Sequence, residues 1–271
     1  MEANDNRPWQ SYHNRQLNGR GWTSYGESRA GSKRASNEDN YILAPLAHDR
    51  LLVAVADGLG GHNAGQVASR LACESLYDAT RNGALDPTDH SDRSIVHALA
   101  AVVLDAHQRI AMWSKDIAAF EGMGCTLTAA IIAAHRAWYC HVGDSRLYQI
   151  GSTTCLQITQ DHSVKSGLSG DGLSTEREND SRSGQLLTQA LGIEEKHHRL
   201  NIRHDAIALR GDDALLLCTD GLHGCLPRQR LAAIVRGDSA LDKRVHQLIE
   251  ASLEAGSCDD ITAVLVALAP D

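Results

Sequence analysis

Two short apolar runs that each lead into the dipeptide Asp-Gly constrain this chain more than any other feature. Residues 51–56 run into Asp57-Gly58, and residues 214–218 run through Thr219 into Asp220-Gly221. A short apolar run bounded by glycine is typical of a buried strand, so both acids should lie where a strand leaves the core. Further acids occupy similar transitions, namely Glu38, Asp39, Asp144, Asp259 and Asp260. If these strand ends meet, the carboxylates repel one another unless a cation neutralises them, which predicts a site for hard divalent ions.

The composition is that of a globular chain with no general affinity for polyanions. The 271 residues are 42% hydrophobic and carry a net charge of −8. This size suits one large domain, and the negative charge argues against general binding to nucleic acids or anionic membranes. The polar start and the lack of an apolar stretch of ~18 residues predict neither a signal peptide nor a transmembrane helix. Seven cysteines without a CxxC pair predict a reducing, cytoplasmic compartment, and we expect a monomer.

The order of the predicted elements favours an α+β fold with antiparallel sheets over strict βαβ alternation. Helices are predicted from Ala64, along an apolar stripe from Ile95 to Trp113, and over residues 228–235 and 241–254. Residues 1–20 are polar and aperiodic, which predicts a mobile tail, and residues 21–271 are expected to form a single domain. The segment from Asp161 to about Gln185 is rich in glycine, serine and charge, as lids and binding loops are.

The clustered acids indicate a particular chemistry. Carboxylates combined with carbonyl and water ligands select Mg²⁺ or Mn²⁺, whereas zinc prefers histidine and cysteine, which show no suitable spacing in this sequence. Hard cations bound in this way activate water and clamp a phosphoryl group. Since no serine or cysteine stands out as a nucleophile, water is the expected attacker. Arg34, just upstream of Glu38 and Asp39, is placed to bind phosphate oxygens.

Seven short blocks follow one another in a specific order. They are RASNED at residues 34–39, DGLGGH at 57–62, GCT at 124–126, GDSR at 143–146, DHS at 161–163, TDGL at 219–222 and SCDDIT at 257–262. One Asp-Gly alone is common in turns, but the ordered set resembles the PP2C (PPM) metal-dependent protein serine/threonine phosphatases of bacterial type over roughly residues 22–268. The resemblance implies a PP2C-like four-layer αββα fold, in which a central antiparallel β-sandwich is flanked by pairs of helices and holds the metals at one end.

The same resemblance implies a set of ligands for two or three Mn²⁺ or Mg²⁺ ions. Asp57 would bridge two ions, and the Gly58 carbonyl would add a ligand. Asp220 and Asp259 would hold one of these ions, Glu38 would face the other, and Asp39 would bind directly or through water. Asp144 would share a third ion with Asp220.

The resemblance also implies roles for residues that contact the substrate. Arg34 would grip the phosphate, and residues 164–185 would form the flap beside the active site. Family members of eukaryotic type carry a histidine directly after the first Asp-Gly as general acid, where this chain has Leu59, so His62 becomes the candidate acid. Asp260 stands where asparagine is usual in the family and adds an acid beside Asp259.

These expectations describe a protein serine/threonine phosphatase that uses metal-activated water. Its partners would be phosphorylated proteins, such as the targets of a bacterial Ser/Thr kinase. Two alternatives come from other classes: a catalytically silent, metal-binding module that recognises phosphoproteins, and a metal phosphoesterase that acts on a small molecule.

Overall fold

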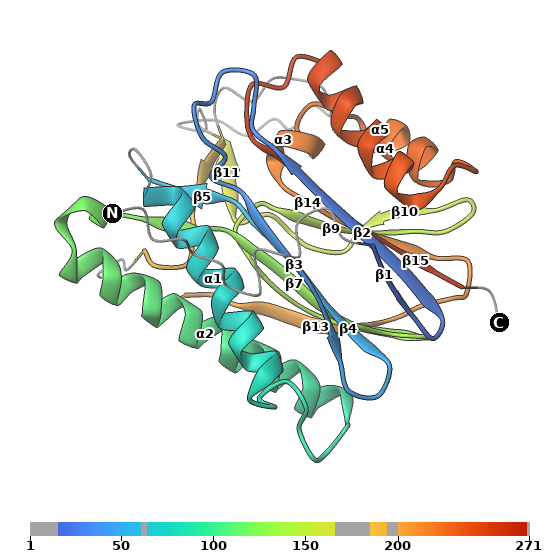
Figure 1. Ribbon diagram of the computed structural model, residues 1–271, viewed down its shortest axis with the longest axis horizontal. Coiled ribbons are helices and arrows are strands. Elements are labelled where there is room, and N and C mark those ends of the chain that lie inside the picture. The colour runs from blue at the N-terminus through green and yellow to red at the C-terminus, as the bar shows by residue number, and fades with distance from the viewer. Residues whose placement is uncertain (1–15, 61–63, 166–184, 194–199, 270–271) are drawn as a thin grey trace, which may run out of the picture.

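The computed structural model describes residues 16–60, 64–165, 185–193 and 200–269, and most of its strands lie in two antiparallel sheets (Figure 1). In spatial order, the first sheet consists of β13 (Arg203–Ala208), β8 (Arg136–Val142), β7 (Leu127–Ala133), β4 (Arg50–Ala56) and β3 (Asn40–Leu46). The second consists of β1 (Gln16–Gly19), β2 (Trp22–Arg29), β15 (Ile261–Leu268), β14 (Ala214–Cys218), β9 (Arg146–Ile150) and β10 (Cys155–Gln157). Two small ribbons pair β5 (Gly58–Leu59) with β6 (Gly124–Cys125), and β11 (Ser163–Lys165) with β12 (Gln185–Leu187).

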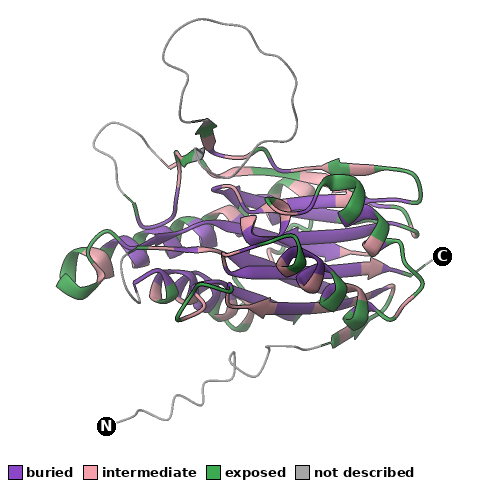
Figure 2. Ribbon diagram, turned by 90° about the horizontal axis from the view of Figure 1, so that it is seen from above, coloured by how far each residue is buried: buried purple, intermediate pink, exposed green. Residues whose placement is uncertain are grey.

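The central strands of each sheet are buried on both faces, because successive side chains point to opposite sides, one covered by the other sheet and one by helices. In β4, Leu51, Val53 and Val55 pack in the core between the two sheets. Leu52, Ala54 and Ala56 of the same strand pack in a second core beneath the helices. Since neither face meets water, these strands read as continuous apolar runs without polar alternation, and Figure 2 shows them as the buried centre of the molecule.

Two pairs of helices form the outer layers. Helices α1 (Ala64–Arg81) and α2 (Asp92–Asp116) cover the five-stranded sheet, and α4 (Arg228–Val235) and α5 (Leu241–Glu254) cover the six-stranded sheet (Figure 1). The one-turn helix α3 (Asp220–His223) and the 3-10 helix Ala118–Phe120 complete the described helices. The four layers are the αββα arrangement expected from the sequence.

The apolar stripe predicted along residues 95–113 accounts for the apolar composition of α2. By length and composition this helix could cross a membrane. Its residues Ile95, Leu99 and Val103 instead pack into the core shared with α1 and the five-stranded sheet. The helix is therefore accounted for as a core element of the sandwich.

The predicted tail needs one correction. Residues 16–19 form strand β1, which pairs with β2 from Gln16 opposite Tyr25 to Gly19 opposite Trp22. The prediction of a tail is wrong for these residues, because backbone pairing with a neighbouring strand holds a segment that has no apolar pattern of its own. The rest of the predicted tail, residues 1–15, lies outside the described residues.

Candidate active site

The predicted acids lie at one end of the β-sandwich because of how the strands pair. Asp39 immediately precedes β3 and Asp57 immediately follows β4, and the adjoining residues Asn40 and Ala56 are opposite each other in the sheet. Likewise Asp220 comes just after β14 and Asp259 just before β15, where Cys218 pairs with Ala263. The turn from β8 to β9 brings Asp144 to the same end, since Cys218 also pairs with Arg146.

Electrostatic repulsion centres on Asp57. Burial raises the pKa of this carboxyl group well above its ordinary value, and the charges of Asp39, Asp220, Asp259 and Asp144 raise it further. Each of these four carboxylates is therefore close enough to Asp57 to repel its charged form. Burial, followed by the charges of Asp220 and Asp161, raises the pKa of Asp144 to about 7. Such a cluster favours the binding of cations.

Asp39 sits at the base of this cluster. Its Oδ2 accepts hydrogen bonds from the hydroxyl groups of Thr219 (2.8 Å) and Thr262 (2.7 Å). Its buried Oδ1 has no hydrogen-bond partner among the described residues. Burial raises the pKa of Asp39 to about 8, although the two threonine hydroxyls oppose that rise. The two threonines belong to the quoted sequence blocks, but the sequence did not reveal that they hold Asp39, since residues 39 and 262 meet only in the folded chain.

Asp57 is positioned through its backbone. Its amide donates to the hydroxyl of Thr126 (3.1 Å), and its carbonyl accepts from the Thr126 amide (2.9 Å). The following Gly58 leaves no room for a side chain, because a Cβ there would lie 2.2 Å from the Gly65 carbonyl oxygen and 2.6 Å from that of Glu38. This close approach packs the turn after β4 against the start of α1.

Arg34 pairs with two of the acids. Its guanidinium donates to Glu38 Oε2 (3.3 Å) and to Asp259 Oδ1. Among the residues that the structure describes, no three of the acids at this end bring single oxygen atoms within 4.8 Å of one another. Arg34 thus acts as a counter-ion for part of the cluster.

Two histidines hold the turn that carries Asp144. His162 accepts a hydrogen bond from the Gly143 amide at its Nδ1 (3.2 Å) and donates from its own amide to the Gly143 carbonyl (2.7 Å). A ring nitrogen of His223 lies 3.0 Å from the Asp144 carbonyl oxygen. Asp161 forms an ion pair with Arg146, with Nη2 and Oδ2 2.7 Å apart. The 161–163 block is therefore structural, and it supports the Asp144 turn at the base of the predicted flap.

Asp260 ties the Arg34 loop to the start of β15. Its Oδ1 accepts from the Gly31 amide (2.9 Å) and its Oδ2 from the Glu38 amide (2.8 Å), and the side chain is buried. Both carboxylate oxygens are thus acceptors for backbone donors. The acid that the sequence placed beside the ligand Asp259 fixes the loop that carries Arg34, Glu38 and Asp39.

Asp260→Asn is expected to destabilise the protein, since its amide nitrogen would face a backbone N–H. Loss of one hydrogen bond to a charged acceptor costs about 1.5–3 kcal/mol. Thermal unfolding of the variant checks this, with Asp212→Asn as a control that removes a charge from an exposed position. An unchanged melting temperature in Asp260→Asn would show that the carboxylate does not hold the loop.

Two predicted features lie outside the described residues. They are His62, the candidate general acid, and residues 166–184 of the predicted flap. The base of that segment is described, where β11 and β12 pair from Ser163 opposite Leu187 to Lys165 opposite Gln185. The role of His62 stays a prediction.

The donor set fits a hard divalent cation. It consists of carboxylates with backbone carbonyls nearby, and the buried Oδ1 of Asp39 has no hydrogen-bond partner among the described residues. Mg²⁺ and Mn²⁺ prefer such oxygen ligands. Neutralising the repulsion centred on Asp57 gives the binding its driving force.

Comparison with known proteins decides the family. The model of the family described as "Protein phosphatase 2C" matches residues 26–265. The chain belongs to the protein phosphatase 2C family. It is a PP2C-type protein serine/threonine phosphatase, as the ordered sequence blocks indicated.

Serine/threonine phosphatases are similar in sequence to this chain over most of its length. This phosphatase is 32% identical over 237 residues to the serine/threonine phosphatase stp of Listeria welshimeri, covering 87% of this chain and 92% of that protein. It is 34% identical over 239 residues to the phosphatase PstP of Mycobacterium tuberculosis, covering 88% of this chain and 43% of that longer protein. The structure of the PstP catalytic domain in complex with two manganese ions superposes with a TM-score of 0.74 at 30% identity, covering 92% of this chain and 99% of that one.

Proposed function

We propose that this phosphatase hydrolyses phosphoserine and phosphothreonine in proteins at a site for two Mn²⁺ or Mg²⁺ ions, with room for a third. The observation that carries the proposal is that strand pairing brings five acids, Asp39, Asp57, Asp144, Asp220 and Asp259, to one end of the sandwich, where the other four raise the pKa of Asp57. The manganese complex of the PstP catalytic domain supports the choice and number of ions. The substrates would be phosphoproteins, such as targets of a bacterial Ser/Thr kinase, in the cytoplasm.

The position of each residue suggests which ion it would bind or which side chain it would hold in place. Asp57, Asp220 and Asp259 would hold one ion, and Asp57 with the Gly58 carbonyl would hold the other, with Glu38 and Asp39 beside them. Asp144 and Asp220 would hold the third. When bound, these ions would supply the nucleophile by lowering the pKa of a water molecule and would neutralise the phosphoryl oxygens. Thr219, Thr262 and Asp260 would keep the acids in place without touching the substrate.

Arg34 is the group that would meet the substrate phosphate. Its guanidinium already pairs with Asp259 and Glu38 at the rim of the cluster, and 41% of its side chain is exposed. With cations bound to these acids, the guanidinium would be free to make two parallel hydrogen bonds to phosphoryl oxygens. The phosphate would thus replace carboxylates as the partner of Arg34.

Arg34→Ala is expected to lower kcat/KM for a phosphothreonine peptide by roughly 10–100-fold, the value of a hydrogen bond to a charged group. Arg34→Lys keeps the charge but loses the forked geometry, so it should recover only part of the loss. Steady-state kinetics at saturating Mn²⁺ measure both variants. Equal kinetics in wild type and Arg34→Ala would exclude the role in phosphate binding.

One assay tests the proposed function as a whole. Hydrolysis of a phosphothreonine peptide, a phosphoprotein and p-nitrophenyl phosphate is measured with Mn²⁺, with Mg²⁺ and with EDTA. We expect activity with either ion and none with EDTA. Activity that survives EDTA would overturn the mechanism. Phosphopeptide binding without turnover would favour the silent module, and faster turnover on a panel of phosphorylated metabolites would favour the small-molecule phosphoesterase.

A further inference from the structure

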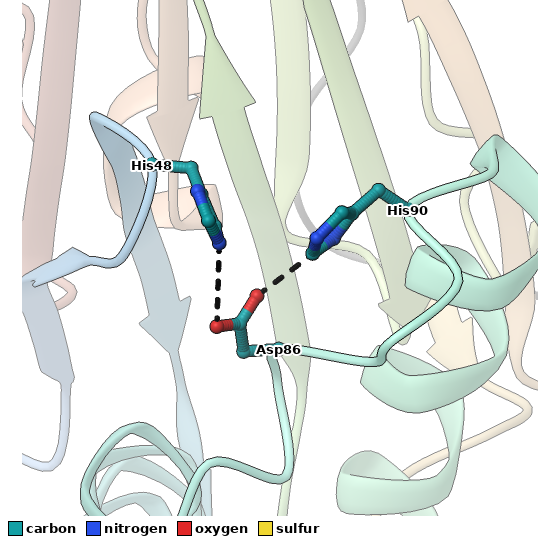
Figure 3. A group of neighbouring side chains, drawn as sticks. All are labelled: His48, Asp86 and His90. Carbon is teal, nitrogen blue, oxygen red and sulfur yellow. Dashed lines mark ion pairs between the residues drawn. The ribbon is translucent and has the colours of Figure 1, made fainter.

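A second group of metal-ligating side chains lies at the opposite end of the sandwich from the acidic site. His48 is in the turn between β3 and β4, and Asp86 and His90 are in the connection between α1 and α2 (Figure 3). Strand β4 runs seven residues from this turn to Asp57, which separates the two sites by about 20 Å at ~3.3 Å per residue. The cluster therefore takes no part in the proposed hydrolysis.

The three side chains point toward one another. His48 Nε2 is 3.7 Å from Asp86 Oδ2, and His90 Nδ1 is 3.9 Å from Asp86 Oδ1. One ligand atom from each residue lies within 4.8 Å of the other two. Among the residues that the structure describes, this is the one such group of three or more histidine, cysteine or acidic side chains. The group could not be predicted from the sequence, because residues 48 and 90 lie on different elements.

The backbone around the cluster is tightly held. The buried Arg50 donates to Asp86 Oδ1 and, through Nε, to the Ala47 carbonyl oxygen (3.1 Å). His48 and Asp49 adopt left-handed φ angles of 61° and 54°, the only positive values among the described non-glycine residues. Trp22 Nε1 secures this turn by donating to the Asp49 carbonyl oxygen (2.9 Å). Such strained positions persist only where the surroundings enforce them.

The chemistry of the donors selects a metal different from that of the acidic site. Two imidazole nitrogens and one carboxylate oxygen are ligands for Zn²⁺ and similar transition metals, and three protein ligands leave a fourth position to water. Arg50 donates to Asp86 Oδ1, the oxygen that also faces His90, so Oδ2, which faces His48, is the oxygen that would bind the ion. Ligand atoms around tetrahedral zinc lie about 3.3 Å apart. The rings, which are 61% and 52% exposed, therefore need to close by at most roughly 1.5 Å.

We propose that His48, Asp86 and His90 form a peripheral binding site for Zn²⁺ or a similar transition-metal ion, which links the β3–β4 turn to the α1–α2 connection. The ion would replace the two long contacts to Asp86 with direct bonds from all three side chains. Mg²⁺ is a poor ion for this site, because imidazole ligands do not suit it. The two kinds of site are therefore separable by the choice of metal.

Calorimetric titration of the full chain with Zn²⁺ in a large excess of Mg²⁺ tests the proposal, since Mg²⁺ occupies the acidic site. We expect one Zn²⁺ per chain in wild type, and binding at least ~10-fold weaker in His48→Ala and in His90→Ala. His97→Ala, at an exposed position of α2, is the matched control and should bind like wild type. Phosphatase activity with Mg²⁺ should be unchanged in all three variants, which confirms that they are folded.

Two outcomes would overturn the proposal. One is Zn²⁺ binding of equal strength and stoichiometry in wild type, His48→Ala and His90→Ala, which would place the ion elsewhere. The other is the absence of measurable Zn²⁺ binding when wild type is titrated in excess Mg²⁺. In that case the two histidines serve only as partners of the Asp86 carboxylate.

Discussion

Asp57→Asn is expected to reduce hydrolysis of a phosphothreonine peptide by about 10³-fold or more at saturating Mn²⁺, which corresponds to several kcal/mol of transition-state stabilisation. Asp57 is the point where the repulsion of four other carboxylates converges. The change keeps the size of the side chain but removes the charge that would be shared between two ions. Steady-state kinetics over a range of Mn²⁺ concentrations separate weaker metal binding from a lower maximal rate.

The same variant should change the melting temperature in opposite directions without and with metal. Without metal, the folded wild type must either hold a buried charge at Asp57 against the other four acids or bind a proton there, and Asp57→Asn removes that cost, so its melting temperature in EDTA should exceed that of wild type. In Mn²⁺ the order should reverse, because only wild type gains the full binding free energy. Asp212→Asn removes an exposed charge and should change neither quantity. A catalytically normal Asp57→Asn would refute the assignment of the active site.

The metal-free protein should lose stability as the pH rises from 6.5 to 8.5. Burial raises the folded-state pKa of Asp39 to about 8 and that of Asp144 to about 7, whereas both are ordinary acids in the unfolded chain. The folded state thus binds more protons than the unfolded state in this range, and the free energy of unfolding falls as those protons leave. A loss of 1 kcal/mol lowers the melting temperature by roughly 2–4 °C in a chain of this size.

The decline should be steeper above pH 6.5 than below it, because a buried histidine opposes the acids at lower pH. Burial lowers the folded-state pKa of His141 to about 4, so this one group favours the unfolded state as the pH drops from 6.5 toward that value and offsets part of the effect of the two acids. Thermal unfolding in EDTA across both ranges should therefore show a change of slope near pH 6.5.

Thermal unfolding in saturating Mg²⁺ tests whether these acids cause the decline in stability. Bound cations need deprotonated carboxylates, so Mg²⁺ should flatten or reverse the decline above pH 6.5. Asp39→Asn, which keeps an oxygen acceptor for Thr219 and Thr262, should flatten it without metal. An identical decline in EDTA and in Mg²⁺ would show that the acids at this end do not cause it.

Local pattern was sufficient to predict much of the fold. The helices at residues 228–235 and 241–254 lie where the apolar periodicity predicts them. The runs before Asp57 and Asp220 are buried strands, β4 and β14, and the acids leave the core together at their ends. These features were accessible because the alternation and spacing of apolar residues depend only on neighbours in the chain.

Contacts between residues far apart in the chain could not be predicted from local pattern. Strand β1 exists through its pairing with β2, and Asp39 is held by Thr262 from the other sheet. Asp260 is a clamp for the Arg34 loop because folding brings the Gly31 and Glu38 amides to its two oxygens. A sequence lists donors and acceptors but not which of them meet.

The order of residues in the chain thus predicted the family, the layers and the acids of the candidate active site, since all three follow from local pattern and from ordered motifs. The tertiary structure decided how those acids are held, that Arg34 neutralises two of them, and that His48 and His90 share Asp86. These contacts join segments far apart in the chain, and only the packing of the two sheets and their helices brings them within reach.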